Sequence, residues 1–305
     1  MHFSVSGDDT WREGKLVLED GILYFCSKEE SKHFFTRVLF LRKGEKIHII
    51  VPVGSIRDVI REKNDRLSIK YVGTAQSPAP GQGSSPEQLL STTLIAAEHV
   101  LNDVERELVL RMDANKFTIY FMTTSDLRSM KKDLELEKGL LKIASEVLWI
   151  IGRGGLKRIA GDDIVHVEQK KRGVYQGTEY GAISIEYFSE GSAYANVLST
   201  IVIAKGTSIE AVLRALLELK NAYTQKEKLS ELENRILTMM YLGVIDLAPS
   251  ALVSAAQALG LREQELTNHL EHLNELGLID LANERLMKKG LKSAILLSKH
   301  STSGG

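Results

Sequence analysis

Near the end of the chain, three side chains able to bind metal ions recur at helical spacing. Glu265, His269 and His272 occupy positions i, i+4 and i+7, which share one face of an α-helix. A zinc site of this kind needs a fourth ligand and hydrogen-bonded support for each imidazole. The sequence indicates neither, and a solvated face opposite the leucines of the same helix explains the spacing equally well. We therefore assign no metal and no cofactor.

The sequence contains none of the common catalytic motifs. It has no G-x-x-x-x-G-K-[ST] or G-x-G-x-x-G loop, no G-x-S-x-G turn, no C-x-x-C pair and no H-E-x-x-H motif. The glycines at 152, 154 and 155 fall between two predicted strands, where a hairpin turn explains them. The single cysteine, Cys26, can form neither an intramolecular disulfide nor a thiolate metal cluster. We expect a protein that is not an enzyme.

The charge balance excludes a strong overall attraction to polyanions. The 305 residues include 39 Lys and Arg against 40 Asp and Glu, a formal net charge of -1. No global pull toward nucleic acid or an anionic membrane follows from such a balance. The first residues do not resemble a signal peptide, and no run of about 18 apolar residues occurs. We expect a soluble, cytoplasmic protein with no membrane insertion.

Two halves of the first 200 residues share a pattern of strands and glycines. Each half has a glycine, a strand, a tight turn, a second strand and then an I-x-x-V strand, in the same order. Such repetition indicates a duplicated β domain, although half-buried strands also resemble one another through simple alternation. The matching segments are residues 14–18 with 139–143, 22–25 with 147–150, 56–59 with 164–167, and 68–71 with 184–187.

The first predicted domain covers residues 1–136. Asp20-Gly21 has the residues that favour a hairpin tip, and a second hairpin is expected around residues 43–45. Residues 73–91 contain three of the five prolines and few large apolar side chains, which predicts a flexible loop. Further strands are expected at 56–60, 66–72, 93–100, 106–112 and 116–122, followed by a short helix at 125–135.

The second predicted domain covers residues 137–224 and repeats the plan of the first. A loop at 173–180 is expected between matched strands, and the strands end near Gly206. Thr207 and Glu210 form a capping-box pattern, and apolar residues follow at helical spacing. Two small β domains, each closed by a helix, suggest tandem pleckstrin-homology-like or GRAM-like folds within an α+β protein.

The third predicted domain, residues 225–305, is helical. Ser230 and Glu233 form a capping box, Pro249 suits the first turn of a second helix, and Gly260 and Gly277 mark helix ends. Residues 278–281, a turn at Asn283 and then residues 285–297 suggest a wing and a final helix. This order is typical of a winged-helix domain.

The charge of the third predicted helix, residues 262–276, disfavours DNA as its partner. One arginine stands against Glu263, Glu265, Glu271 and Glu275, so the helix would repel phosphates. The basic residues near the first hairpins are interleaved with acids, which also disfavours lipid binding. A winged helix that binds protein is favoured, with no nucleic acid partner.

The order of these segments resembles the archaeal taxis adaptor family CheF. The resemblance rests on Trp11-x-x-Gly14-x-Leu16-x-Leu18 with residues 22–25, on residues 52–59, on residues 229–238 with Tyr241-Leu242-Gly243-Val244, and on residues 259–261 and 273–279. It covers nearly the whole chain except residues 73–91 and the last eight residues.

The resemblance implies an adaptor that binds the phosphorylated response regulator CheY and acts on the switch proteins of the archaellum motor. It also implies a homodimer located at the cytoplasmic face of that motor. The polar faces that remain after packing is assigned are candidate CheY contacts, namely Glu265, His269, His272, Arg285, Lys288, Lys289 and Lys292. Two alternatives remain open: a winged-helix transcription regulator with duplicated β sensor domains, and a peripheral scaffold recruited by lipid.

Overall fold

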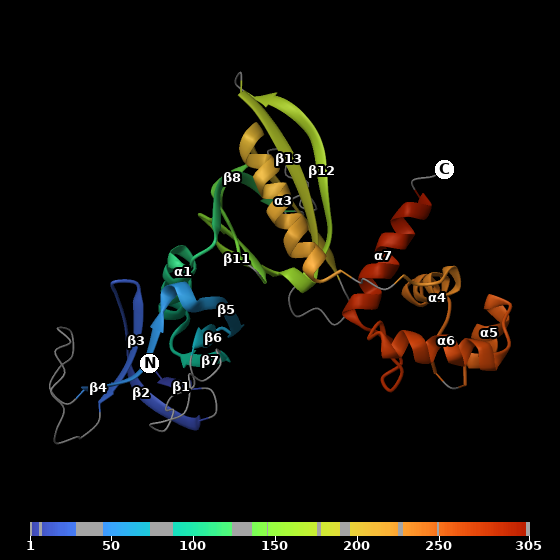
Figure 1. Cartoon of the computed structure of the whole chain (residues 1–305), viewed down its shortest axis with the longest axis horizontal. Helices are drawn as coiled ribbons and strands as arrows, with labels where there is room; N and C mark the ends of the chain where they lie inside the picture. Colours follow the sequence, from blue (N-terminus) through green and yellow to red (C-terminus); the bar gives the residue numbers. More distant parts are fainter. Residues whose placement is uncertain are drawn as a thin grey trace, which may run out of the picture. The chain divides into compact units, whose positions relative to one another are not determined.

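The chain has an α+β fold in which two seven-stranded antiparallel sheets precede a helical region (Figure 1). The structure is a computed structural model and describes residues 2–5, 8–28, 45–73, 88–123, 136–144, 146–175, 178–189, 196–224, 228–248 and 250–302. The predicted α+β class is confirmed. By its internal contacts the chain forms two compact units, residues 1–118 with 139–158, and residues 119–138 with 159–305.

The first sheet has the strand order β4-β3-β2-β1-β7-β6-β5. The predicted hairpin at Asp20-Gly21 is confirmed, because both residues have positive φ angles of 49° and 74° at the turn between β2 and β3. The elements of this repeat are β1 (His2–Val5), β2 (Asp8–Glu19), β3 (Ile22–Lys28), β4 (Glu45–Pro52), the short 3-10 helix η1 (Val53–Ser55), β5 (Ile56–Lys63), β6 (Arg66–Gly73), β7 (Gln88–Ile95) and α1 (Glu98–Arg111).

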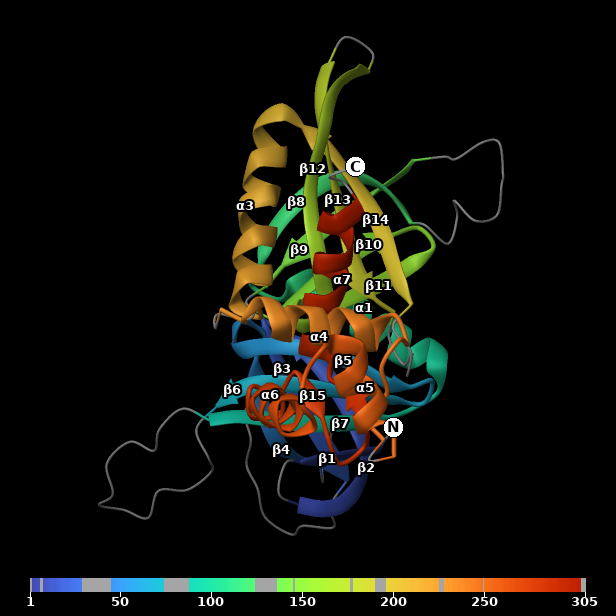
Figure 2. The same ribbon diagram turned by 90° about the vertical axis from the view of Figure 1, so that its right-hand side faces the viewer.

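The second sheet has the order β11-β10-β9-β8-β14-β13-β12. Numbered from its own first strand, this order is the same as that of the first sheet. Its elements are β8 (Asn115–Thr123), β9 (Glu137–Ile143), β10 (Val147–Gly152), β11 (Gly155–Ala160), η2 (Gly161–Asp163), β12 (Ile164–Tyr175), β13 (Thr178–Phe188), β14 (Val197–Lys205) and α3 (Gly206–Ala222). Helix α3 lies against β12, β13 and β14 (Figure 2).

The two sheets share side-chain contacts as well as strand order. In each sheet a tyrosine hydroxyl lies near a threonine hydroxyl, at 3.4 Å for Tyr71 and Thr92 and at 2.9 Å for Tyr187 and Thr200. Each also pairs two serines across neighbouring strands, and each shifts register after the first residue of its fifth strand. The repeat predicted from the sequence is therefore present in the fold.

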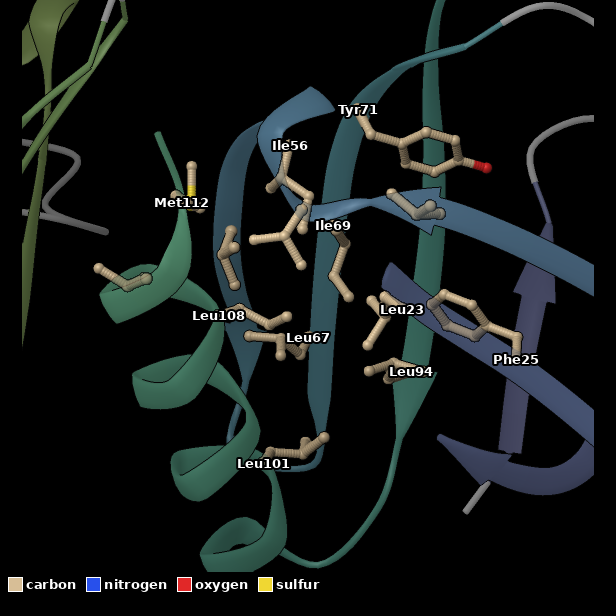
Figure 3. Packing of buried hydrophobic residues seen from close by; sticks show 14 of the residues in the cluster. Leu23, Phe25, Ile56, Leu67, Ile69, Tyr71, Leu94, Leu101, Leu108 and Met112 are labelled. Carbon is tan, nitrogen blue, oxygen red and sulfur yellow. The ribbon is translucent and has the colours of Figure 1, made fainter. Parts of the chain in front are cut away.

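The core of the first unit shows why α1 forms a helix. Leu101 and Leu108 are seven residues apart and both lie buried against the sheet, with Val104 partly buried between them (Figure 3). They pack with apolar side chains of β3, β5, β6 and β7, and Trp149 of β10 belongs to the same cluster. A fully buried leucine contributes about 2 kcal/mol to folding, so this amphipathic stripe stabilises the helix.

The structure corrects three strand predictions. Residues 106–112 lie in and just beyond helix α1, because the Leu108–Leu110 run that suggests a strand continues the helical stripe. The strand predicted at 93–100 ends at Ile95. The strand predicted at 116–122 exists as β8, but it pairs with β14 in the second sheet and does not complete the first.

Two predicted loops contain strand residues. Residues 88–91 belong to β7, which pairs with β6 over its whole length; residues 74–87 lie outside the described residues. In the loop predicted at 173–180, residues 173–175 belong to β12 and residues 178–180 to β13, and Gly173 pairs with Tyr180 and Tyr175 with Thr178. Residues 176 and 177 lie outside the described residues. The hairpin segment at 34–41, the turn residues 43 and 44, and the helix at 125–135 lie outside the described residues.

The helical region follows the predicted order. It comprises α4 (Glu231–Tyr241), α5 (Leu252–Leu259), α6 (Glu263–Glu275), a two-stranded sheet of β15 (Ile279–Asp280) and β16 (Arg285–Leu286), and α7 (Lys288–Thr302). Pro249 lies outside the described residues. The predicted domain boundaries near residues 136 and 224 remain predictions. Among the described helices, none combines the length and apolar character needed to cross a membrane.

Local capping signals are correct in three helices, α4, α5 and α6, and wrong in one, α3. The Ser230 hydroxyl accepts a hydrogen bond from the Glu233 amide at 3.2 Å, and the Ser230 amide donates to the Glu233 carboxylate at 2.7 Å. Gly260 and Gly277 end α5 and α6 with φ angles of 72° and 67°. Helix α3, however, begins at Gly206 with Lys205 as its N-cap, so Thr207 is inside the helix.

Candidate functional site

Six of the seven predicted contact residues fall into two groups within the second unit, and the seventh is Arg285. Glu265, His269 and His272 lie on α6, whereas Lys288, Lys289 and Lys292 lie in the first turns of α7. Arg285 lies on β16, where its guanidinium is 3.3 Å from the Asp280 carboxylate. The structure therefore offers two polar regions in place of one continuous face.

The α6 group does not converge on a metal position. His272 Nδ1 lies 2.6 Å from Glu233 Oε1, and His269 Nδ1 lies 3.6 Å from the same oxygen. Glu265 instead pairs with Arg262 at 2.5 Å. Among the described residues, no group of three or more His, Cys, Asp or Glu side chains is placed to hold a metal ion. The two histidines thus join α6 to the start of α4.

Glu233 is the buried anion at the centre of this contact, with 5% of its surface exposed. Burial alone would raise the pKa of its carboxyl group. Hydrogen bonds from His272 and from the amide and hydroxyl of Ser230 outweigh burial and lower the pKa to about 2. Glu233 is therefore charged at neutral pH and stabilises the helix start as well as the α4–α6 contact.

The lysines of α7 surround a cleft with a volume of about 440 Å³. We call it the α7 cleft and define it by the polar residues that line it, Asp162, Tyr223, Thr224, Lys288, Lys289 and Lys292. Asp162 belongs to η2, and Tyr223 and Thr224 follow the end of α3. Three cations against one carboxylate make the lining electropositive, and such a lining can hold an anion.

Apolar contacts with the second sheet position α7. Leu291 and Ile295 pack against Val165 and Phe188, and Lys299 pairs with Glu186 of β13. Near its start the helix passes very close to the main chain of Leu278, because a Cβ atom at Gly290 would lie 2.0 Å from the Leu278 carbonyl oxygen. Only glycine permits this approach, and it brings the first turn of α7 to the cleft.

Lys288 and Lys289 are already engaged at the cleft wall. The Lys288 ammonium lies 2.8 Å from Asp162 and 2.5 Å from Asp163. Lys289 donates a hydrogen bond to the Leu276 carbonyl oxygen at 3.3 Å. Neither aspartate was among the residues predicted from the sequence, because Lys288 is more than 120 residues away in the chain. The sequence signal for them was a pair of acidic residues directly before a predicted strand.

The end of α4 exposes apolar side chains that the sequence did not single out as functional. Tyr241, Leu242 and Val244 are 40%, 61% and 59% exposed. We call these three residues the α4 apolar end. Large apolar residues at a helix end were a visible signal, but one that usually indicates burial.

Comparison of helix ends shows that this exposure is unusual within the domain. Helices α4, α5 and α6 all end in a Schellman motif with glycine at the left-handed position. The residue after that glycine normally packs against its own helix. Leu278 after α6 is fully buried and Leu261 after α5 is partly buried, whereas Val244 after α4 is exposed.

Comparisons with known proteins do not identify the chain. No protein-family model matches it, and no curated protein matches it. Among solved structures, it is similar to the crystal structure of the C-terminal domain of an unknown protein from Leishmania infantum. That likeness has 14% sequence identity and a TM-score of 0.25, and it covers 39% of this chain and 97% of the other. A similarity this low supports no argument about fold or function.

Proposed function

We propose that this protein is a non-enzymatic taxis adaptor of the CheF kind. In this proposal it binds the phosphorylated response regulator CheY and relays the signal to the switch proteins of the archaellum motor, as a homodimer at the cytoplasmic face of that motor. The sequence resemblance supplies the identity of the partners. The observation that carries the proposal in the structure is the α4 apolar end, because a protein that works by docking needs an exposed apolar surface.

The fold is compatible with this proposal at a finer level. We propose that each seven-stranded sheet with its following helix is a pleckstrin-homology-like or GRAM-like module. We also propose that α4, α5 and α6 with the β15–β16 hairpin form a winged helix. The order of strands, closing helices and hairpin supports these assignments.

The α4 apolar end has the composition of a docking surface. Protein interfaces are enriched in aromatic and other large apolar side chains at their centre. Contiguous exposed apolar residues on a soluble domain usually mark an interaction site. Tyr241 and Leu242 follow one another at the helix end, and Val244 lies just beyond Gly243, so the three can contact one partner surface.

The predicted polar contacts His269 and His272 of α6 reach the other end of α4. Glu233 and His272 meet at the start of α4, and Tyr241 is the last residue of α4, eight residues further along. Eight residues of α-helix span about 12 Å. The polar α6 group and the α4 apolar end are therefore separate candidate surfaces that mutagenesis can distinguish.

An adaptor of this kind needs no chemistry of its own. Phosphorylation shifts a receiver domain toward one conformation, and a protein that prefers that conformation reads the signal by binding. A tenfold preference requires about 1.4 kcal/mol of differential contact. Exposed apolar and polar side chains are sufficient to supply that difference.

The transcription-regulator alternative is less well supported. In the proposed winged helix, α6 would be the recognition helix, but its exposed residues include Glu263, Glu271 and Glu275. These carboxylates would repel a DNA backbone. No described feature favours DNA over a protein partner.

Calorimetric titration of the cognate CheY receiver domain tests the proposed surface. We expect binding when the receiver carries beryllofluoride, which mimics the aspartyl phosphate, and at least tenfold weaker binding without it. Leu242→Ser with Val244→Ser should weaken the activated complex at least tenfold. Val253→Ser is the matched control, because Val253 is a 50% exposed valine on α5 of the same domain.

Two results would count against the proposal as stated. Unchanged binding by the double serine variant, together with a loss in Arg285→Glu, would move the site to the polar β15–β16 hairpin that carries Arg285. The absence of any binding to the activated receiver would contradict the adaptor function itself.

A further inference from the structure

The α7 cleft has more positive charge than its own carboxylates neutralise. Lys288 is held by Asp162 and Asp163, and Lys289 donates to a main-chain carbonyl. Lys292 has no hydrogen-bonding or ion-pairing partner among the described residues, although it lines the cleft. Lys220 does not line the cleft but is close enough to interact electrostatically with Lys292, so the cleft and its immediate surroundings hold four lysines and two aspartates. The local net charge is therefore +2.

Lys292 is the residue most in need of a counter-ion. Burial, the largest cause, lowers the pKa of its ammonium group to about 8, and repulsion from Lys288 and Lys220 adds to the effect of burial. Asp162 and Asp163 oppose this change without reversing it. An incompletely paired, partly buried cation is unfavourable, and an anion in the cleft would relieve it.

The start of α7 adds hydrogen-bond donors at the same place. The Leu291 amide donates to the Met287 carbonyl at 2.9 Å, so Lys288, Lys289 and Gly290 form the first turn. Their amides have no acceptor within the helix. Amides at a helix start, together with the helix dipole, favour phosphate and other anions.

The size and remaining lining of the cleft favour a ligand larger than a simple ion. A volume of about 440 Å³ is within the range of about 300–1,000 Å³ that small organic ligands occupy. The ring of Tyr223 packs over Gly161, where a Cβ atom would lie 2.6 Å from the ring. Tyr223 and Met287 give the cleft an aromatic and apolar wall beside the lysines.

We propose that the α7 cleft binds a phosphorylated small molecule, with the phosphate group against Lys289, Lys292 and the first turn of α7 and the organic part against Tyr223 and Met287. A phosphate monoester carries a charge of about −1.5 to −2 at pH 7, which matches the net charge of the cleft. This site is distinct from the α4 apolar end, and the proposal does not depend on the adaptor function.

Amide resonances of Lys288, Lys289 and Gly290 provide a direct test. We would titrate the whole chain with inorganic phosphate and then with adenosine monophosphate, and follow these resonances by nuclear magnetic resonance. We expect saturable shifts with both probes. Lys292→Gln should raise the titration midpoint at least tenfold, and Lys292→Arg should keep it within about threefold of the original chain, because a cation is retained.

Lys205→Gln is the matched control, because Lys205 is an exposed lysine at the end of β14 outside the cleft. We expect its midpoint to be within twofold of the original. Absence of saturable shifts, or an unchanged midpoint in Lys292→Gln, would overturn the proposal. Lysine-dependent binding to phosphatidylglycerol vesicles with no response to free phosphate would also overturn the proposal, because the bound phosphate group would then belong to a lipid and not to a small molecule.

Sulfate keeps a constant charge between pH 7 and 9. Any change in sulfate binding over this interval therefore reports the protonation of the protein and not that of the ligand. Sulfate binding should weaken over this interval as Lys292 loses its proton. The groups that face Lys292 are Asp162 and Asp163 from η2, Lys220 from α3 and Lys288 from α7 itself. Lys292→Gln should remove most of this pH dependence, and an equal dependence in that variant would contradict the role of Lys292.

Discussion

The two sheets have the same strand order but differ where α7 packs. Arg57 on β5 is exposed, whereas the equivalent Val165 on β12 is 1% exposed beneath α7. Lys70 on β6 corresponds to Glu186 on β13, which pairs with Lys299 of α7. The tyrosine–threonine and serine–serine pairs occur in both sheets. The side chains that contact α7, Val165 and Glu186, are replaced by Arg57 and Lys70 at the equivalent positions of the first sheet.

A second difference lies one residue further along the same strands. Asp58 of the first sheet is 3% exposed and accepts two hydrogen bonds from Arg158, at 3.0 Å and 2.5 Å. The equivalent His166 has a buried Nδ1 with no hydrogen-bond partner among the described residues. Burial, followed by Lys220, lowers the pKa of His166. This strand position therefore holds a carboxylate that pairs with Arg158 of β11 in the first repeat, and a neutral imidazole in the second.

Exchanging the residue beneath α7 should have the largest effect. Val165→Arg would place a charge between β12 and α7. We expect the free energy of unfolding to fall by on the order of 4 kcal/mol, or α7 to detach completely. Urea unfolding measures the first outcome, and the protease sensitivity of α7 measures the second. The reverse exchange in the first repeat, Arg57→Val, should change stability by less than about 0.5 kcal/mol, because Arg57 is exposed. Equal losses of stability in Val165→Arg and Arg57→Val would show that the two strand positions do not differ in their contribution to stability.

Breaking the ion pair between Asp58 of the first sheet and Arg158 of β11 should cost slightly less. Asp58→Asn leaves the largely buried Arg158 without its carboxylate, and we expect about 3 kcal/mol of destabilisation by urea unfolding. Asp58→Asn with Arg158→Met should recover part of that loss. A double variant as unstable as the sum of the two single variants would show that the pair is not coupled.

Acid should weaken the helical region through Glu233. Its pKa of about 2 in the folded chain is below the usual 4.5, so its contribution is complete above pH 4.5 and is lost as the pH falls toward 2. Glu233→Gln should cost about 2 kcal/mol at pH 7 and reduce the pH dependence between 4.5 and 2. Glu231→Gln, an exposed neighbour in the same turn, is the control and should change little.

The surface ion pair between Lys299 and Glu186 should have the smallest effect. Lys299 is 44% exposed and Glu186 is 23% exposed, and pairs of this kind contribute less than about 1 kcal/mol. Lys299→Gln should therefore lower the unfolding midpoint only slightly, and high salt should have a similar effect on the original chain. A loss as large as that in Val165→Arg would mean that charge, and not apolar packing, holds α7.

Most of the successful predictions concern structure that is decided by neighbouring residues, although the Thr207 capping box, a local prediction that is wrong, is an exception. The Ser230 capping box, the glycines at 260 and 277 and the Asp20-Gly21 hairpin depend on local geometry, and all are present. The repeat could also be predicted, because matching strands keep their alternation. Helix α1 was missed because a short run such as residues 108–110 has the same apolar character in a helix and in a strand.

Contacts between distant residues could not be predicted. His272 meets Glu233 across 39 residues, and Lys288 meets Asp162 across 126. Lys142 of β9 is fully buried and donates to the Met112 carbonyl at 2.8 Å near the end of α1. Such pairs depend on how whole elements pack, and spacing along the chain carries no signal for them. For the same reason, the sequence indicated three lysines near residue 290 but not the cleft they line.

Size-exclusion chromatography with light scattering tests the adaptor function most directly. The chain would be analysed alone, and then mixed with the cognate CheY receiver domain with and without beryllofluoride. The account predicts a dimer that gains the receiver only in the activated state. No complex in either state would contradict it.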